Sequence, residues 1–77
     1  MAADPVVVVI AADPRRTGRA FEGMRIAAGI VGSETPVAVV LRGPAAHLLD
    51  ADTEDLVDGD EVATVRDALR RLGVPFH

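Results

Sequence analysis

Two uninterrupted runs of mostly β-branched residues constrain the fold of this chain more than any other feature. Residues 6–11 read VVVVIA and residues 36–41 read PVAVVL, and each run is bounded by turns that contain proline or glycine. Neither run alternates apolar with polar residues, so a strand formed by either one is expected to be covered on both faces. This pattern is typical of parallel strands inside an α/β sheet, and we therefore predict an α/β fold with a parallel sheet.

Between the two runs, residues 17–32 have the pattern of an amphipathic helix. Thr17 is the expected N-cap and Gly32 the expected end. Ile26 and Ile30 fall outside the main apolar stripe and widen the apolar surface. The stripe itself recurs at helical spacing and consists of Ala20, Phe21, Met24, Ala27, Ala28 and Val31. A strand, a helix and a strand in this order predict a βαβ unit with a right-handed crossover.

The rest of the chain predicts two helices and a third strand. Residues 45–49 are expected to form a short apolar helix, and residues 74–77 a short final strand. The helix between them has the clearest apolar face, formed by Val62, Val65, Leu69 and Leu72. We expect a single domain, residues 1–77, with three αβα layers and the element order strand, helix, strand, helix, helix, strand.

Composition excludes several kinds of chemistry. The chain has no Cys, which excludes disulfides, thiolate metal sites and cysteine nucleophiles. All 8 basic residues are Arg, so a Schiff-base lysine is excluded, and a net charge of −4 without Trp or Tyr disfavours nucleic-acid binding. The first apolar run is short and follows an acidic residue, so we expect neither an export signal nor a membrane span. A cytoplasmic location is the resulting expectation.

The apolar content favours assembly with another subunit. Apolar residues make up 49% of the 77 residues, although a chain of this size buries only about 60% of the surface that its unfolded form exposes. A small parallel sheet also leaves unpaired edges. We therefore expect a homo-oligomer. The alternative, an Ala- and Val-rich composition without any interface, stays open at this point.

A candidate ligand site is expected at the carboxyl edge of the sheet, where doubly wound folds bind their ligands. The first loop could hold an anion with its arginines and the following helix N-terminus, and the histidine after the second strand could act as a base or a ligand. The residues concerned are Arg15, Arg16, Thr17, Arg42, Gly43 and His47. The loop lacks a glycine-rich fingerprint and a Walker lysine, so a nucleotide site is not expected. The alternatives are a solvated loop whose arginines neutralise Asp13, and an exposed helix histidine.

The acidic stretch 50–61 partly matches the pattern of a calcium loop. Counted from Asp50, acidic residues fall at several of the ligand positions of such a loop. However, Asp55 occupies the position where an EF-hand requires glycine for its sharp turn. A solvated acidic linker is the preferred interpretation. No metal, cofactor or catalytic residue is predicted.

Four segments, taken in order, resemble the DsrE/DsrF/TusD-like family of sulfur-relay proteins. They are VVVVIAA, RAFEGMRIAAGIVG, PVAVVLRGPAAHLL and LRRLGVPFH, and together they cover nearly the whole chain. The resemblance lies in hydrophobic blocks and turns: the second strand runs into a glycine turn, and the last helix reaches a strand through Gly-Val. It implies a DsrE-like fold and subunits that assemble into dimers, trimers or hexamers.

The resemblance also bears on activity. Catalytic members carry sulfur on a cysteine that follows the last of these strands, whereas this sequence reaches His77 and contains no cysteine. The resemblance therefore implies a non-catalytic member, or a minimal version with three strands. We expect a structural or partner-binding subunit related to intracellular sulfur transfer, with a cysteine-bearing relay protein as its partner. The alternative is a small-ligand or anion-binding domain that uses the loops at the carboxyl edge.

Overall fold

The computed structural model describes residues 4–77 and shows an α/β protein with a parallel sheet. Its elements are β1 (Val6–Ile10), α1 (Arg19–Gly32), β2 (Val37–Leu41), the 3-10 helix η1 (Gly43–Leu49) and α2 (Gly59–Arg71). β1 and β2 pair in parallel, with Val6 opposite Val37 and Ile10 opposite Leu41. The predicted α/β class and the predicted parallel sheet are therefore confirmed. The expected absence of an export signal rests partly on residues 1–3, which lie outside the described residues.

The third predicted strand is reduced to a single bridge beside β2. Val39 and Phe76 form this parallel bridge. The Val39 amide donates to the Pro75 carbonyl at 2.9 Å, and the His77 amide donates to the Val39 carbonyl at 2.8 Å. β2 thus lies between β1 and the C-terminal segment. The element order differs from the prediction in two places, because the fourth element is a 3-10 helix and the sixth is this bridge.

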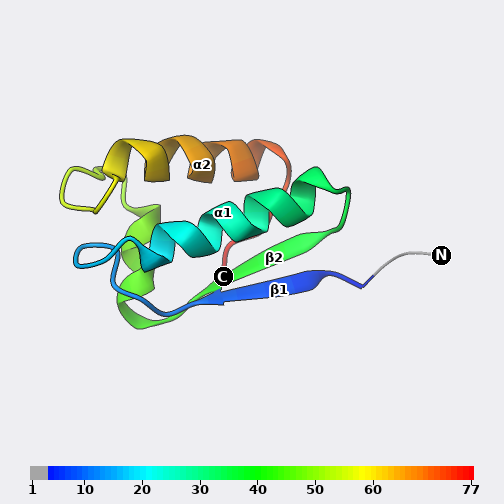
Figure 1. Ribbon diagram of the computed structural model, residues 1–77, viewed down its shortest axis with the longest axis horizontal. Helices are drawn as coiled ribbons and strands as arrows, with labels where there is room; N and C mark the ends of the chain where they lie inside the picture. The colour runs from blue at the N-terminus through cyan, green and yellow to red at the C-terminus, as the bar shows by residue number, and fades with distance from the viewer. Residues whose placement is uncertain (1–3) are drawn as a thin grey trace.

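Both α-helices lie on the same side of the strands (Figure 1). Two right-handed crossovers that advance across a sheet in the same direction place their helices on the same face. Residues 4–77 therefore form two layers, where three αβα layers were predicted. The opposite face of β1 is uncovered, since Val7 is 55% and Val9 56% exposed. The unbroken apolar run of β1, which had indicated cover on both faces, belongs to a strand that is covered on one.

The hydrophobic core fills the space between the sheet and the two helices. α1 contributes four residues of its predicted stripe, which are buried: Ala20, Phe21, Met24 and Ala27. α2 contributes Val62 and Leu69. Leu72 was predicted on the same face but is 65% exposed, because it follows the last helical residue and forms the C-cap.

The helix ends show how local sequence positions the elements. The N-cap of α1 is Gly18 and not Thr17, whose hydroxyl accepts a hydrogen bond from the Arg19 amide at 3.3 Å. α1 ends at Gly32, as predicted. Gly73 follows α2 with a φ of +81°, a conformation that favours glycine and turns the chain back toward β2. Within residues 4–77, none of the helices combines the length and apolar character that crossing a membrane requires.

Candidate functional site

The loops that follow β1 and β2 lie together at the carboxyl edge of the sheet (Figure 1). The Arg42 amide donates to the Ile10 carbonyl at 2.9 Å, which holds the end of β2 beside the end of β1. The loop that precedes α2 contacts the same region, because the Val57 amide donates to the carbonyl of the fully buried Pro14 at 2.8 Å. The six predicted site residues are therefore on neighbouring segments.

Asp13 organises the first loop. Its carboxylate accepts hydrogen bonds from Nε, Nη2 and the backbone amide of Arg15 at 3.0, 2.9 and 3.0 Å. Its backbone carbonyl accepts from the amides of Arg16 and Thr17 at 3.1 and 3.2 Å. The side-chain and backbone hydrogen bonds from Arg15 lower the pKa of Asp13 to about 2, and the carboxylate raises the pKa of Arg15. Arg15 is thus engaged inside its own loop, which agrees with the alternative of a charge-neutralised solvated loop.

The other predicted site residues are held locally or point into solvent. His47 lies on η1, where its Nδ1 is 2.9 Å from an Asp50 carboxylate oxygen. Gly43 has a φ of +57° and turns the chain from β2 into η1. Arg16 is 86% exposed with its Nε 4.0 Å from Asp13, and Arg42 is exposed without an ion pair to any residue of 4–77. The predicted site residues share an edge of the sheet, but none of them lines the cavity described next.

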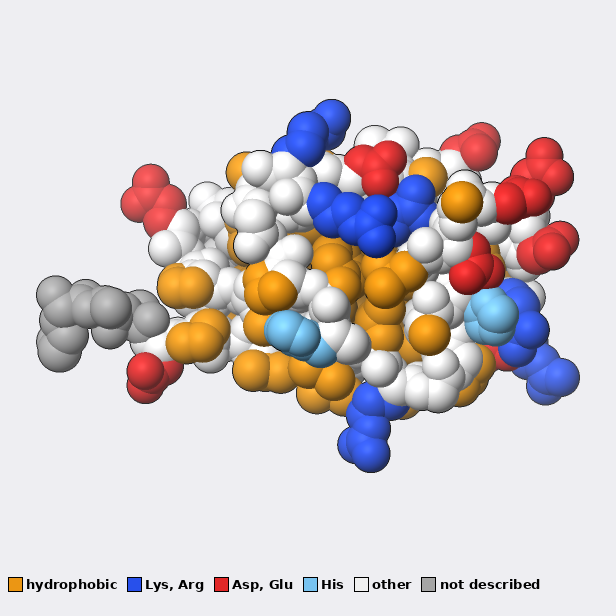
Figure 2. Space-filling view, turned by 180° about the vertical axis from the view of Figure 1, so that it is seen from behind, with side chains coloured by type: hydrophobic (Ala, Val, Ile, Leu, Met, Phe, Trp, Pro, Cys, Tyr) orange, Lys and Arg blue, Asp and Glu red, His pale blue; other side chains and the backbone are white. Residues whose placement is uncertain are grey.

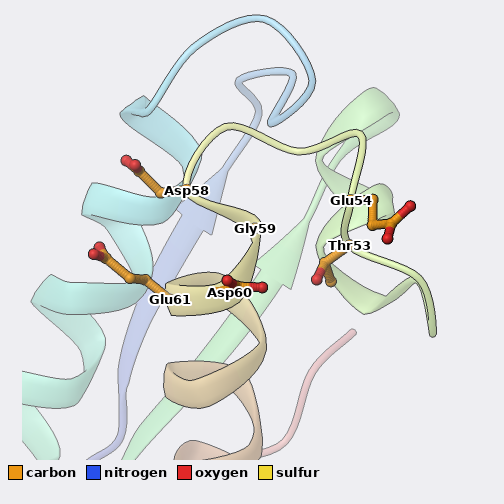
Figure 3. A pocket seen from close by; sticks show the side chains of 6 residues that line it. All are labelled: Thr53, Glu54, Asp58, Gly59, Asp60 and Glu61. Carbon is orange, nitrogen blue, oxygen red and sulfur yellow. The ribbon is translucent and has the colours of Figure 1, made fainter.

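A cavity of about 500 Å³ lies at the N-terminus of α2 (Figure 3). It is lined by residues outside the predicted site: Thr53, Glu54, Asp58, Gly59, Asp60 and Glu61. The carboxylates do not converge, since Asp58 and Glu61 point toward α1 while Glu54 points away on the far side of the loop. In the described part of the chain, no group of three acidic or histidine side chains is arranged to hold a metal ion. The calcium-loop alternative for residues 50–61 therefore gains no support.

The acidic residues before and within the first turn of α2 have a structural explanation. Asp60 and Glu61 lie in that first turn, and Asp58 is the N-cap residue. Negative side chains at this end complement the positive end of the helix dipole. The opposite end carries Arg70 and Arg71 in its last turn, with the complementary sign. The charge pattern of α2 thus stabilises the helix without requiring a ligand.

Arg66 is the buried polar residue that sequence analysis missed. It is 7% exposed, and its Nη1 donates to the carbonyls of Leu48 and Asp50 at 3.2 and 2.7 Å, while its Nε donates to Asp67 at 3.1 Å. The carbonyls at the end of a helix lack hydrogen-bond donors inside that helix. At the end of η1 the guanidinium of Arg66 is the donor. The burial of Arg66 could have been predicted from its spacing, since it falls between Val62 and Leu69 on the buried face of α2. Its role is to hold α2 against η1.

The uncovered face of the sheet is an apolar surface. Val7 and Val9 on β1 stand beside the half-buried Ala38 and Val40 on β2, with which they are in register. Figure 2 shows hydrophobic side chains along the lower border of the molecule, on the side of the strands away from the helices, and acidic side chains gathered at the end that carries the loop before α2. We refer to Val7, Val9, Ala38 and Val40 as the open face. Its chemistry suits contact with another protein better than it suits catalysis.

No protein family matches the chain, and neither a curated protein nor a solved structure was found to be similar to it. Function is therefore inferred from the residues and their geometry.

Proposed function

We propose that this chain is a non-catalytic subunit that acts by binding another protein through its open face. The observation that carries the proposal is the exposure of Val7 and Val9 beside Ala38 and Val40, on two hydrogen-bonded strands without a charged residue. Removing apolar surface from water contributes about 25 cal/mol per Å² before the costs of association are subtracted. Because the strands hold these side chains rigidly, little conformational entropy is lost when a partner covers them.

Intracellular sulfur transfer is the proposed setting, and it comes from the resemblance to the DsrE/DsrF/TusD-like family. The parallel pairing of β1 and β2 and the glycine turn from α2 into the C-terminal bridge are features that support it. The proposal keeps a DsrE-like element order in which the C-terminal bridge beside β2 stands in place of a full third strand. The sequence contains no cysteine, so the sulfur would be carried by a cysteine-bearing partner.

The experiment places a charge on the open face and on a matched control position. Ala38→Glu puts a carboxylate between Val7 and Val40, whereas Ala51→Glu makes the same change at an exposed position of the loop before α2. Purified cysteine-bearing sulfur-relay proteins, in thiol and persulfide forms, are immobilised, and binding of each variant is measured by biolayer interferometry. We expect binding by the wild type and by Ala51→Glu, with a loss of about tenfold or more for Ala38→Glu.

Two results would contradict the proposal. If Ala38→Glu bound as tightly as the wild type, the open face would not be the binding surface. If the wild type bound none of the relay proteins, the sulfur-transfer setting would be wrong. Far-UV circular dichroism of each variant shows whether the fold is intact.

A second proposal is a small-ligand or anion-binding domain that uses the loops at the carboxyl edge. The observation that favours it is the exposure of Arg16 and Arg42 on neighbouring loops without a strong carboxylate partner. Titration with inorganic sulfate, followed by NMR of the backbone amides, tests it directly. Saturable shifts at Arg42 and Gly43 that disappear in Arg42→Ala would support this second proposal, and shifts that stay linear with salt would contradict it.

A further inference from the structure

We infer that β1 pairs with β1 of a second copy of this chain, antiparallel across a two-fold axis at Val8, so that two sheets join into one. The inference rests on the proposed function in one respect, which is that the chain acts by assembling with another protein. It adds a partner, a second copy of this chain, and a surface other than the open face. The surface is the outer edge of β1 together with the adjoining side of α1. Four observations carry it.

The first observation is the direction of the backbone groups of β1. On the edge that faces β2, the Val6 amide donates to the Pro36 carbonyl at 2.8 Å and the Ile10 carbonyl accepts from the Arg42 amide at 2.9 Å. Successive residues of a strand direct their backbone groups to opposite edges. The amides and carbonyls of Val7 and Val9 therefore point outward.

The second observation is that this edge is open to pairing. β1 contains neither a charged residue nor a proline, which are the features that natural edge strands use against pairing. Val7 and Val9 are symmetric about Val8, the middle residue of β1. Antiparallel pairing centred on Val8 places Val7 opposite Val9 of the second copy and the reverse, each pair exchanging both backbone hydrogen bonds. In this register every residue of β1 has a partner in the second copy.

The third observation is that an exposed residue of α1, Ile26, lies beside Val8 when positions are measured along β1. A Cβ on Gly23 would lie 2.9 Å from Ile10 Cγ1, which fixes the level of α1 relative to β1. Val8 lies two residues before Ile10, about 6.6 Å back toward the start of β1. Because α1 runs antiparallel to β1, about four residues forward along the helix cover the same distance. Ile26 is therefore close to the level of Val8, and it is 60% exposed.

The side of α1 on which Ile26 lies also agrees with the inference. Phe21 faces α2, where it lines a groove together with Val65. Ile26 is five residues further along the helix and points about 140° away from Phe21 at 100° per residue. It thus lies on the side of α1 away from α2, above the outer edge of β1. A two-fold axis at Val8 brings it opposite Ile26 of the second copy.

The fourth observation is charge complementarity at the ends of α1. The two-fold axis makes the α1 helices of the two copies antiparallel, so the start of one lies beside the end of the other. Arg19 is the first residue of α1, and Glu34 follows its C-cap residue Ser33. Both are exposed, and neither forms an ion pair within the described residues. In the dimer each Arg19 faces Glu34 of the second copy.

Introduced cysteines test the geometry, because the chain has none of its own. In the Ile26→Cys variant the thiols of two copies face each other across the axis, and mild oxidation should convert most of the protein into a disulfide-linked dimer. Leu72→Cys is the matched control, since Leu72 is 65% exposed but lies at the end of α2. We expect its cross-linking to be at least about tenfold slower at equal protein concentration.

Native mass spectrometry and sedimentation then test the energetics. The wild type should be a dimer, and Ile26→Glu should raise the dimer Kd by about tenfold or more while Leu72→Glu leaves it unchanged. Arg19→Glu should weaken the dimer, and the double variant Arg19→Glu with Glu34→Arg should restore it. If Arg19→Glu weakened the dimer only by impairing folding, adding Glu34→Arg would not restore dimerisation.

The inference is overturned if the wild type is monomeric at every concentration measured. It is also overturned if a dimer forms but Ile26→Glu does not weaken it and Ile26→Cys links no faster than Leu72→Cys. In both cases the proposed function is judged separately, by the effect of Ala38→Glu on binding to a relay protein, because Ala38 lies on β2 and away from the paired edge.

Discussion

Alanine at Gly59 should destabilise the protein, whereas alanine at Gly29 should stabilise it. Gly59 is the first residue of α2, and a Cβ there would lie 2.9 Å from the carbonyl carbon of Thr53 and still closer to its oxygen. This obstacle is backbone, so rotation of a side chain cannot remove it. Gly29 lies within α1 and is exposed, and a Cβ there would meet nothing within 4 Å. The added methyl group therefore meets backbone atoms in α2 and open space in α1.

The magnitudes follow from two opposing effects. Alanine is more favourable than glycine inside a helix by about 1 kcal/mol, and this is the whole effect expected at Gly29. At Gly59 the added carbon must displace the loop that carries Thr53, and such overpacking costs about 1–3 kcal/mol. A displaced loop also weakens the contacts that it makes with the first loop. We expect Gly59→Ala to lower the free energy of unfolding by up to about 2 kcal/mol net, against the 5–15 kcal/mol typical of a domain.

Urea denaturation measures the difference. Because the chain contains neither Trp nor Tyr, far-UV circular dichroism is the appropriate probe. The transition midpoint should fall for Gly59→Ala and rise for Gly29→Ala, with slopes close to that of the wild type. A Gly59→Ala variant at least as stable as the wild type would refute the close packing of α2 against Thr53.

Two further predictions concern polar side chains. Arg66→Met should lower the free energy of unfolding by about 2–3 kcal/mol in urea denaturation, since it leaves the carbonyls of Leu48 and Asp50 without their donor; the same change at the exposed Arg71 should have an effect below about 0.5 kcal/mol. The Asp13 carboxylate contributes stability that is fully present above its usual pKa of 3.8 and is lost as the pH falls toward its native pKa of about 2. Acid unfolding followed by circular dichroism should show a weaker pH dependence in this window for Asp13→Asn than for Asp4→Asn, and equal profiles would contradict the role of the Arg15 pair.

Local patterns in the sequence were sufficient to predict β1, β2 and α1. The β-branched runs have no competing helical periodicity, and the stripe through Ala20, Phe21, Met24 and Ala27 is buried as its spacing indicates. These predictions succeed because each depends on residues close together in the chain. The parallel pairing of the strands follows from the single helix that connects them.

The layering and the C-terminal bridge could not be predicted in the same way. Whether helices cover one face or both depends on the direction in which the third segment is added to the sheet, and local periodicity does not record that direction. The bridge at Phe76 forms beside β2, so α2 crosses back on the side that α1 already occupies. The engagement of Arg15 at the predicted site could not be predicted either. Its pairing with Asp13 is a contact between side chains that composition alone does not specify.

The exposed valines connect the sequence pattern with the proposed assemblies. An unbroken apolar strand is expected to be covered on both faces, yet in the single chain Val7 and Val9 remain more than half exposed. The helices cannot cover them, because both lie on the opposite side of the sheet (Figure 1). We therefore propose that the cover which the pattern predicts comes from a partner. Binding of a partner on the open face would bury the side chains of these two valines, and pairing with a second β1 would satisfy their backbone groups, so the two surfaces that we propose meet at Val7 and Val9.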